Sequence, residues 1–304
     1  MSSLIIIQQM AVIAILVAIG WGLQRAGILD GITRKHMSFI VVNLTNPCLI
    51  LTTAITSDVR LSHRDFLIAL AVAGVFYIFL ILLGRLLPRI LPIRPDERKF
   101  YDMMIVYTNI GFIGIPIASA VLPDGAMVYV VICNIMFFLF FYTHGIRTLR
   151  EERGGFSVKK LINPGTIASV ITVLLFWFGL KLPLFLNTTI SYIGNATLFL
   201  SLTMLGASLA RADIPGSLKR PGIWCYVVIR MIAVPLALFF ILKALKLPVG
   251  MIEAFALMAM VPAGNLPMVQ AEADGLPTAT LSEGIVGSTI LCFFTITLLM
   301  SLLF

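Results

Sequence analysis

The sequence has little charge for its length. Asp, Glu, Lys and Arg make up 12% of the 304 residues, whereas 60% are hydrophobic. A soluble domain carries roughly 25% charged residues, so a water-exposed surface of ordinary composition is excluded. The long apolar runs also lack the alternation of period two that lipid-facing strands require. The composition therefore predicts an all-α polytopic membrane protein.

The sequence is equally poor in motifs of catalysis and metal binding. Its four cysteines, Cys48, Cys133, Cys225 and Cys292, lie far apart in apolar runs, which is typical of buried packing residues. Gly-x-Ser-x-Gly, His-Glu-x-x-His and Gly-x-x-x-x-Gly-Lys motifs do not occur. An intramembrane protease, the alternative enzyme class, would need a second carboxylate to match Asp102, and no Gly-x-Gly-Asp follows. We expect no enzyme, no cofactor and no metal.

The apolar runs divide into ten segments of about 20 residues, the length that crosses ~30 Å of hydrocarbon. The predicted spans are residues 4–23, 33–56, 65–87, 99–122, 125–147, 164–182, 187–210, 222–245, 250–273 and 277–303.

The distribution of basic residues indicates topology and not nucleic-acid binding, despite the net charge of +8. Of the 22 Lys and Arg residues, sixteen fall around loops after odd-numbered spans, five fall after even-numbered spans, and Arg230 lies inside a span. Basic loops stay in the cytoplasm. We therefore expect a multi-pass protein of the plasma membrane, in a bacterium the inner membrane, with both termini extracytoplasmic.

The longest connection divides five spans from five. An odd number of spans in each half means that the second half enters the membrane upside down relative to the first. We expect a first five-helix repeat at residues 1–147, a cytoplasmic connecting loop at 148–163 and an inverted second repeat at 164–304.

The fourth and ninth spans are interrupted in matching places. The fourth contains Asn-Ile-Gly-Phe-Ile-Gly-Ile-Pro at residues 109–116, and the ninth contains Met-Val-Pro-Ala-Gly-Asn-Leu-Pro at 260–267. Proline breaks helices, and broken helices persist in lipid only where they face protein or a wet cavity. Such paired breaks point to a transporter's binding site, whereas simple kinks are the alternative interpretation.

The motif at residues 109–116 resembles the auxin efflux carrier family of membrane transporters. Pro-x-Gly-Asn-x-Pro at 262–267 and Asn-Leu-Thr-Asn-Pro at 43–47 fit the same family, and the full chain is similar to its compact bacterial members. The resemblance implies two inverted repeats, with spans 1, 2, 6 and 7 as a scaffold. Spans 3–5 and 8–10 would form a mobile, elevator-type transport domain in which helices 4 and 9 cross. Bile-acid/sodium symporters have a similar architecture, so the fold does not identify the substrate.

The interruptions also predict a binding site, because the N-terminal end of a half-helix carries partial positive charge that suits a carboxylate. Asparagines would hydrogen-bond the ligand, glycines would allow close backbone approach, and prolines would fix the breaks. Alternatively, the asparagines satisfy freed backbone or neighbouring helices. The candidate binding residues are Asn109, Gly111, Gly114, Pro116, Gly264, Asn265 and Pro267 at the breaks, and Asn43 and Asn46 on the opposite wall.

Ionisable residues inside spans are candidates for ion coupling. Arg230 could pair with a carboxylate or meet an anionic substrate, and Glu283 could face the cavity or carry a proton. Asp102, His144 and Glu253 lie near span ends, where we expect interfacial positions.

The sequence thus predicts a secondary transporter or facilitator for a small organic anion, such as a monocarboxylate, a dicarboxylate or an auxin-like weak acid. The expected partners are the lipid bilayer, a coupling proton or sodium ion, and a second copy of the chain in a homodimer. The alternatives are a sodium-coupled bile-acid-type symporter of the same architecture and a channel.

Overall fold

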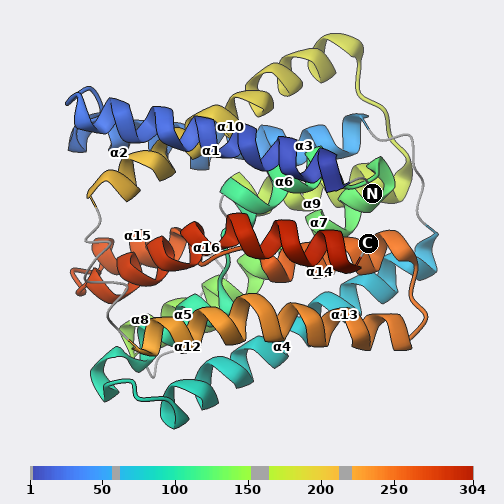
Figure 1. The fold of residues 1–304 in the computed structure, drawn as a ribbon. Helices are drawn as coiled ribbons and strands as arrows, with labels where there is room; N and C mark the ends of the chain where they lie inside the picture. The colour runs from blue at the N-terminus through green and yellow to red at the C-terminus, as the bar shows by residue number, and fades with distance from the viewer. Residues whose placement is uncertain (1–2, 57–61, 152–163, 212–220, 304) are drawn as a thin grey trace.

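The computed structural model describes residues 3–56, 62–151, 164–211 and 221–303. Within these ranges the chain is a bundle of helices (Figure 1). Five helical stretches are long and apolar enough to cross a membrane, namely His63–Ile90, Met127–Arg150, Leu184–Arg211, Pro221–Ala244 and Ala279–Leu303. Part of the connection predicted at 148–163, residues 152–163, lies outside the described residues.

The helices of the first half follow the first five predicted spans. They are α1 (Ser3–Arg25), α2 (Gly31–Ile40), η1 (Val41–Thr45), α3 (Asn46–Thr56), α4 (His63–Ile90), η2 (Pro95–Glu97), α5 (Arg98–Val106), η3 (Ile110–Gly114), α6 (Ile115–Val121), η4 (Asp124–Ala126), α7 (Met127–Phe140), η5 (Phe141–Gly145) and α8 (Ile146–Arg150).

The helices of the second half follow the remaining five. They are α9 (Pro164–Phe178), α10 (Leu184–Arg211), α12 (Pro221–Val228), η7 (Ile229–Ala233), α13 (Val234–Ala244), α14 (Val249–Met260), α15 (Leu266–Ala273) and α16 (Ala279–Leu303). Each predicted segment therefore overlaps helices of the structure to within a few residues, and 99–122 and 250–273 are each divided by non-helical backbone.

Local side chains start two of these helices. The Asp30 carboxylate accepts a hydrogen bond from the backbone N–H of Thr33 at 2.7 Å, which caps α2 and lowers the pKa of Asp30. The Ser62 hydroxyl accepts from the N–H of Asp65 at 3.0 Å and caps α4. Such caps satisfy donors that have no partner inside the helix.

Three π-helical turns each end two residues before a proline. The turns η1, η3 and η7 precede Pro47, Pro116 and Pro235, and each proline is the second residue of the helix that follows. Proline lacks an N–H and its ring clashes with the carbonyl four residues earlier. The wider π turn accommodates the missing N–H and the bulky ring, so these helices continue through their prolines.

The helices pack in two groups. In the upper part of Figure 1, α10 packs against α1 and α3, and α3 packs against α9, whereas α4, α5, α13, α14 and α16 pack below them. The chain ends lie at the same end of the bundle, as do the turns that join α9 to α10 and α13 to α14. The turns between α1 and α2 and between α15 and α16 lie at the other end, so the connections alternate between the two ends.

Candidate functional site

The two predicted interruptions are present, and they contact each other. The helix α5 ends at Val106 and α14 ends at Met260, and an isolated antiparallel bridge pairs Thr108 with Ala263. On either side of this bridge, the N–H of Asn109 donates to the carbonyl of Pro262 at 2.8 Å, and that of Gly264 donates to Tyr107 at 2.9 Å. We call residues 107–109 and 261–265 the crossing. Each segment satisfies backbone groups of the other, as a lipid environment requires.

A glycine and a serine make the close contact possible. A Cβ atom at Gly264 would lie 2.8 Å from the carbonyl oxygen of Thr108, closer than real Cβ atoms come to backbone. On the other side, the N–H of Ala263 donates to the hydroxyl of Ser288 on α16 at 3.2 Å. Gly264 therefore allows the close approach of another backbone segment, and the predicted approach of a ligand stays a prediction.

The two predicted asparagines occupy corresponding positions. Asn109 immediately precedes η3, and Asn265 immediately precedes α15, which is the position where asparagine commonly caps a helix. Asn109 is buried, whereas Asn265 is partly buried, with its side-chain oxygen shielded from solvent. Both side chains thus lie at the start of a second half-helix, where partial positive charge gathers.

The predicted role of the prolines needs a correction. The non-helical backbone lies at the crossing, upstream of Pro116 and Pro267, and these residues are the second residues of α6 and α15. A proline near the start of a helix costs little because the first N–H groups have no partner inside the helix. Pro116 and Pro267 therefore follow the breaks, and Pro262 is the proline within one of them.

The remaining candidate residues have different surroundings in the structure. A Cβ atom at Gly111 would lie 3.0 Å from the side-chain nitrogen of Asn46, so α3 faces η3 at this point. Asn46 is 8% exposed, and its side-chain oxygen accepts no hydrogen bond among the described residues. Asn43 instead donates to the carbonyl of Phe39 in its own helix at 2.9 Å. At Gly114 a Cβ would lie 3.1 Å from the sulfur of Met258, so η3 packs closely on α14.

Arg230 joins the ends of the two interrupted helices. Its Nε donates to the carbonyl of Ile105 at 2.7 Å, and its Nη1 donates to that of Ala259 at 2.5 Å. Each carbonyl belongs to the last residue but one of its helix, α5 or α14. The guanidinium is 1% exposed. A cation at two helix C-termini offsets their partial negative charge. The structure gives Arg230 two backbone partners, and its contact with a carboxylate or a substrate stays a prediction.

Three ionisable residues lie deeper in the protein than the sequence suggested. Asp102 is 5% exposed and Glu253 is 9% exposed, and the His144 side chain is 8% exposed. Neighbouring helices therefore cover most of each side chain, although His144 and Asp102 each line a pocket. The expected interfacial position of the three residues stays a prediction. Glu283 is partly buried on α16, and its coupling role stays a prediction.

Tyr107 is a functional candidate that the sequence reasoning missed. It lies in the crossing, is fully buried, and its hydroxyl is 3.0 Å from Nδ1 of His144. Two features of the sequence could have indicated Tyr107. It lies close to Asn109 in sequence, and ionisable groups inside membranes are functional candidates. The link to His144, 37 residues away, could come only from the packing.

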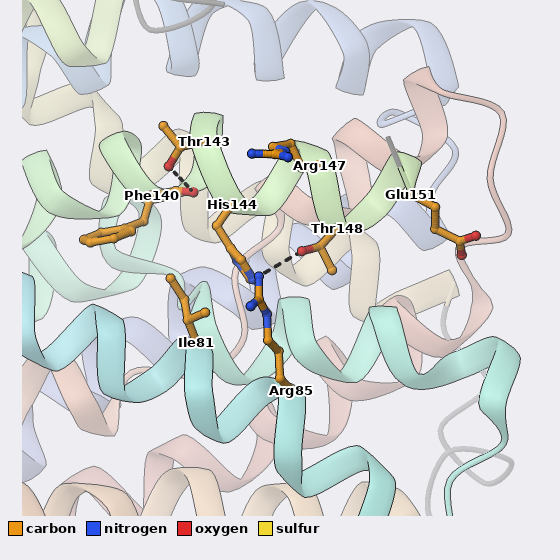
Figure 2. Close-up of a pocket in the computed structure, with 8 residues that line it drawn as sticks. All are labelled: Ile81, Arg85, Phe140, Thr143, His144, Arg147, Thr148 and Glu151. Atoms are coloured by element: carbon orange, nitrogen blue, oxygen red, sulfur yellow. Dashed lines mark hydrogen bonds between the residues drawn. The ribbon is translucent and has the colours of Figure 1, made fainter. Parts of the chain in front are cut away.

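Three pockets are lined by residues outside the crossing. The largest, of about 660 Å³, lies between α4 and the helix formed by α7, η5 and α8 (Figure 2). A second, of about 450 Å³, is lined by α4 and α5 with Asp102 at its wall, and Arg85 and Thr148 line both. A third, of about 290 Å³, lies between α3 and α10. The crossing itself is closed in this structure, since Thr108, Pro262 and Ala263 are buried.

Comparisons with known proteins agree with this architecture. The sequence model of a family described as "Membrane transport protein" matches residues 5–300, and this is the auxin efflux carrier-like family that the motifs indicated. An uncharacterized transporter of Methanocaldococcus jannaschii is 26% identical over 241 residues, which cover 75% of this chain and 76% of the relative. Family and relative are both transporters.

Proposed function

The chain belongs to the membrane transport protein family, and we propose that it carries a small organic anion across the membrane by alternating access. The observation that carries this proposal is the pair of hydrogen bonds across the crossing, between Asn109 and Pro262 and between Gly264 and Tyr107. Paired interruptions near the middle of a membrane protein are where transporters bind their substrates.

The chemistry at the crossing favours a carboxylate as the bound group. Two half-helices, η3 with α6 and α15, begin here, and the free N–H groups and partial positive charge of their first turns attract anions. Asn109, Asn265 and Asn46 would donate hydrogen bonds to the carboxylate. The Asn46 side-chain nitrogen lies against Gly111, so it would donate to a ligand held near this backbone.

Arg230 favours an anion over a cation as the bound species. In sodium-coupled transporters, carbonyl groups at helix C-termini coordinate the ion. Here the guanidinium of Arg230 binds the carbonyls at the ends of α5 and α14. This protein-borne cation supports anion transport without sodium at this position, and it argues against the sodium-coupled bile-acid-type symporter as the alternative.

We also propose the arrangement in the membrane. Residues 1–147 and 164–304 would form two inverted repeats of five spans, joined at 148–163, with both termini extracytoplasmic. The alternation of connections between the two ends of the bundle and the excess of basic residues around the odd-numbered loops support this. The group of α1, α3, α9 and α10 would be the scaffold, and the group with α4, α5, α13, α14 and α16 would move relative to it as an elevator.

Counterflow in proteoliposomes tests the transport proposal. The purified protein is reconstituted, loaded with unlabelled acid and exposed to radiolabelled malate, indole-3-acetate or taurocholate, with sodium present or replaced by potassium. We expect saturable uptake of at least one acid, exchange across the membrane, and no requirement for sodium. Asn109→Ala and Asn265→Ala should each reduce the uptake.

Three results would contradict the proposal. Flux that does not saturate and shows no counterflow would indicate a channel. Uptake that requires sodium would favour the symporter alternative. Wild-type uptake rates in both asparagine variants would show that the substrate binds away from the crossing.

A further inference from the structure

A chain of buried polar side chains connects the surface pockets to the crossing. Oδ2 of Asp102 on α5 is 3.7 Å from Nε2 of His144 on η5, and the two side chains are 7% and 8% exposed. Nδ1 of His144 is 3.0 Å from the hydroxyl of Tyr107. The carbonyl of the same tyrosine accepts the N–H of Gly264 in the crossing. The substrate site proposed above and the Asp102 carboxylate are therefore joined through two residues, His144 and Tyr107.

The hydrogen bonds determine which nitrogen of His144 is open to a further proton. The Tyr107 hydroxyl donates to the carbonyl of Phe140 at 2.8 Å, so it accepts from Nδ1–H of His144. Nε2 then carries a lone pair, to which the Thr148 hydroxyl donates at 3.2 Å (Figure 2). An incoming proton adds at Nε2, the atom that faces Asp102.

The structure makes room for the Asp102 carboxylate but leaves it short of partners. The side chain packs against Gly84 of α4, where any Cβ atom would collide with Oδ1. Oδ1 is buried and accepts no hydrogen bond among the described residues. A buried carboxylate with an unfilled acceptor is costly in the ionised form, so the site favours a state in which a proton neutralises the pair.

Water can reach this pair through the two pockets that Arg85 lines. His144 lines the pocket of about 660 Å³ and Asp102 lines the pocket of about 450 Å³, whereas Tyr107 behind them is fully buried. Arg85 extends from α4 toward His144 in Figure 2. Proton exchange with water can thus occur without opening the crossing.

Several charged and titratable groups surround the pair. They include Arg85 and Arg89 on α4, Asp96 and Glu97 on η2, Arg98, Lys99 and Tyr101 on α5, Tyr142 on η5, Arg147 and Arg150 on α8, Glu151 after α8, and Glu283 on α16. The nearest arginines offset the negative charge of the deprotonated pair, so both the protonated and the deprotonated state are accessible.

We propose that Asp102 and His144 together form a binding site for one proton, and that its uptake and release are coupled to anion transport. This inference rests on the proposed transport function. A hydronium ion in the pockets gives up its proton to Nε2 of His144 or Oδ2 of Asp102 and leaves as water. The pair changes from a net charge of −1 to zero. Tyr107 links this change in charge to the crossing, because its hydroxyl binds His144 and its carbonyl binds Gly264. One proton with one monoanion gives electroneutral transport of a weak acid.

Accumulation driven by a pH gradient tests the coupling. Proteoliposomes with an imposed gradient of one pH unit are given the three labelled acids named above. For the monoanions indole-3-acetate and taurocholate, one proton per anion drives up to about tenfold accumulation. We expect Asp102→Asn, which preserves the shape of the side chain, to abolish accumulation while it retains counterflow. His144→Gln should do the same. Asp96→Asn, at an exposed aspartate paired with Arg94, serves as the matched control and should accumulate like the wild type.

A second measurement is independent of the substrate. Infrared spectra of the protein in lipid, recorded as the pH is changed, should contain a carboxyl band that is absent in Asp102→Asn and present in Asp96→Asn. Wild-type accumulation in Asp102→Asn, or identical infrared titrations of Asp102→Asn and the wild type, would overturn the proposed proton site. A carboxyl band that depends on Asp102 in a protein that transports none of the acids would instead sustain the proton site and contradict the anion transport function.

Discussion

Gly264 lies so close to Thr108 that a methyl group in place of its hydrogen would stand 2.8 Å from the Thr108 carbonyl oxygen. This contact joins two segments that are 156 positions apart in the chain, and the neighbouring hydrogen bond from Gly264 to Tyr107 depends on it. The backbone at this point is also held on its other side, where the N–H of Ala263 donates to the hydroxyl of Ser288.

Replacement of Gly264 by alanine should therefore separate the two interruptions. Overpacking of a close contact costs about 1–3 kcal/mol, so we expect a lower melting temperature and little transport. Gly74→Ala in α4 is the control, since no atom lies within 4 Å of a Cβ there. A Gly264→Ala protein with the melting temperature and transport rate of the wild type would show that the crossing is looser than the structure indicates.

Arg230 should be important for stability as well as charge. In Arg230→Gln the shorter neutral side chain cannot reach both Ile105 and Ala259, and the loss of hydrogen bonds from a charged donor costs about 3 kcal/mol. Thermal unfolding in detergent, followed by fluorescence, measures the effect. Arg94→Gln should change little, because that side chain is 72% exposed. Equal melting temperatures for the two variants would refute the assigned role.

The ion pair between Arg150 and Asp274 should couple the ends of α8 and α15. Two of its hydrogen bonds, at 2.8 and 2.6 Å, involve both carboxylate oxygens, and the side chains are 29% and 15% exposed. A double-mutant cycle with alanine should give a coupling energy of about 1 kcal/mol or more. The same cycle on Arg94 and Asp96, both well exposed, should give a value close to zero. If the two cycles gave the same coupling energy, burial and the two hydrogen bonds would not strengthen the Arg150–Asp274 pair.

Asn43 and Asn46 should differ in their effect on transport although they are three residues apart. Asn43 donates to Phe39 within its own helix, whereas Asn46 faces Gly111 with its side-chain nitrogen, the atom that would donate to a carboxylate. We expect Asn46→Ala to raise the KM of the transported acid by about tenfold, the effect of one lost hydrogen bond to a charged group, and Asn43→Ala to leave it nearly unchanged. A larger effect at Asn43 would place the substrate on the other face of this helix.

Much of the helix pattern was predictable because its causes are local. Apolar segments of about 20 residues, separated by charged loops, correspond to helical stretches of the structure. The prolines were harder to interpret. Pro47, Pro116 and Pro235 look alike in sequence, yet each follows a π turn and none of them breaks its helix, because a wider turn absorbs the missing N–H. The breaks occur upstream of Pro116 and Pro267, where the chain finds partners in the opposite crossing segment.

The candidate site could be located from the sequence, but its partners could not. The repeated Asn, Gly and Pro pattern identified residues 109–116 and 260–267 in both halves. The burial of Asp102, His144 and Glu253 could not be predicted, because distance from a span end says nothing about which helices cover a side chain. The role of Arg230 was open for the same reason.

The sequence by itself determined that this chain is a helical membrane protein with two interrupted helices, since hydropathy and backbone-breaking residues act within a few positions of themselves. The tertiary structure decided which groups meet: Gly264 with Thr108, Arg230 with the ends of α5 and α14, and Asp102 with His144 and Tyr107. A buried polar group needs a partner in space, and helix packing supplies that partner from a segment that can lie more than a hundred residues away.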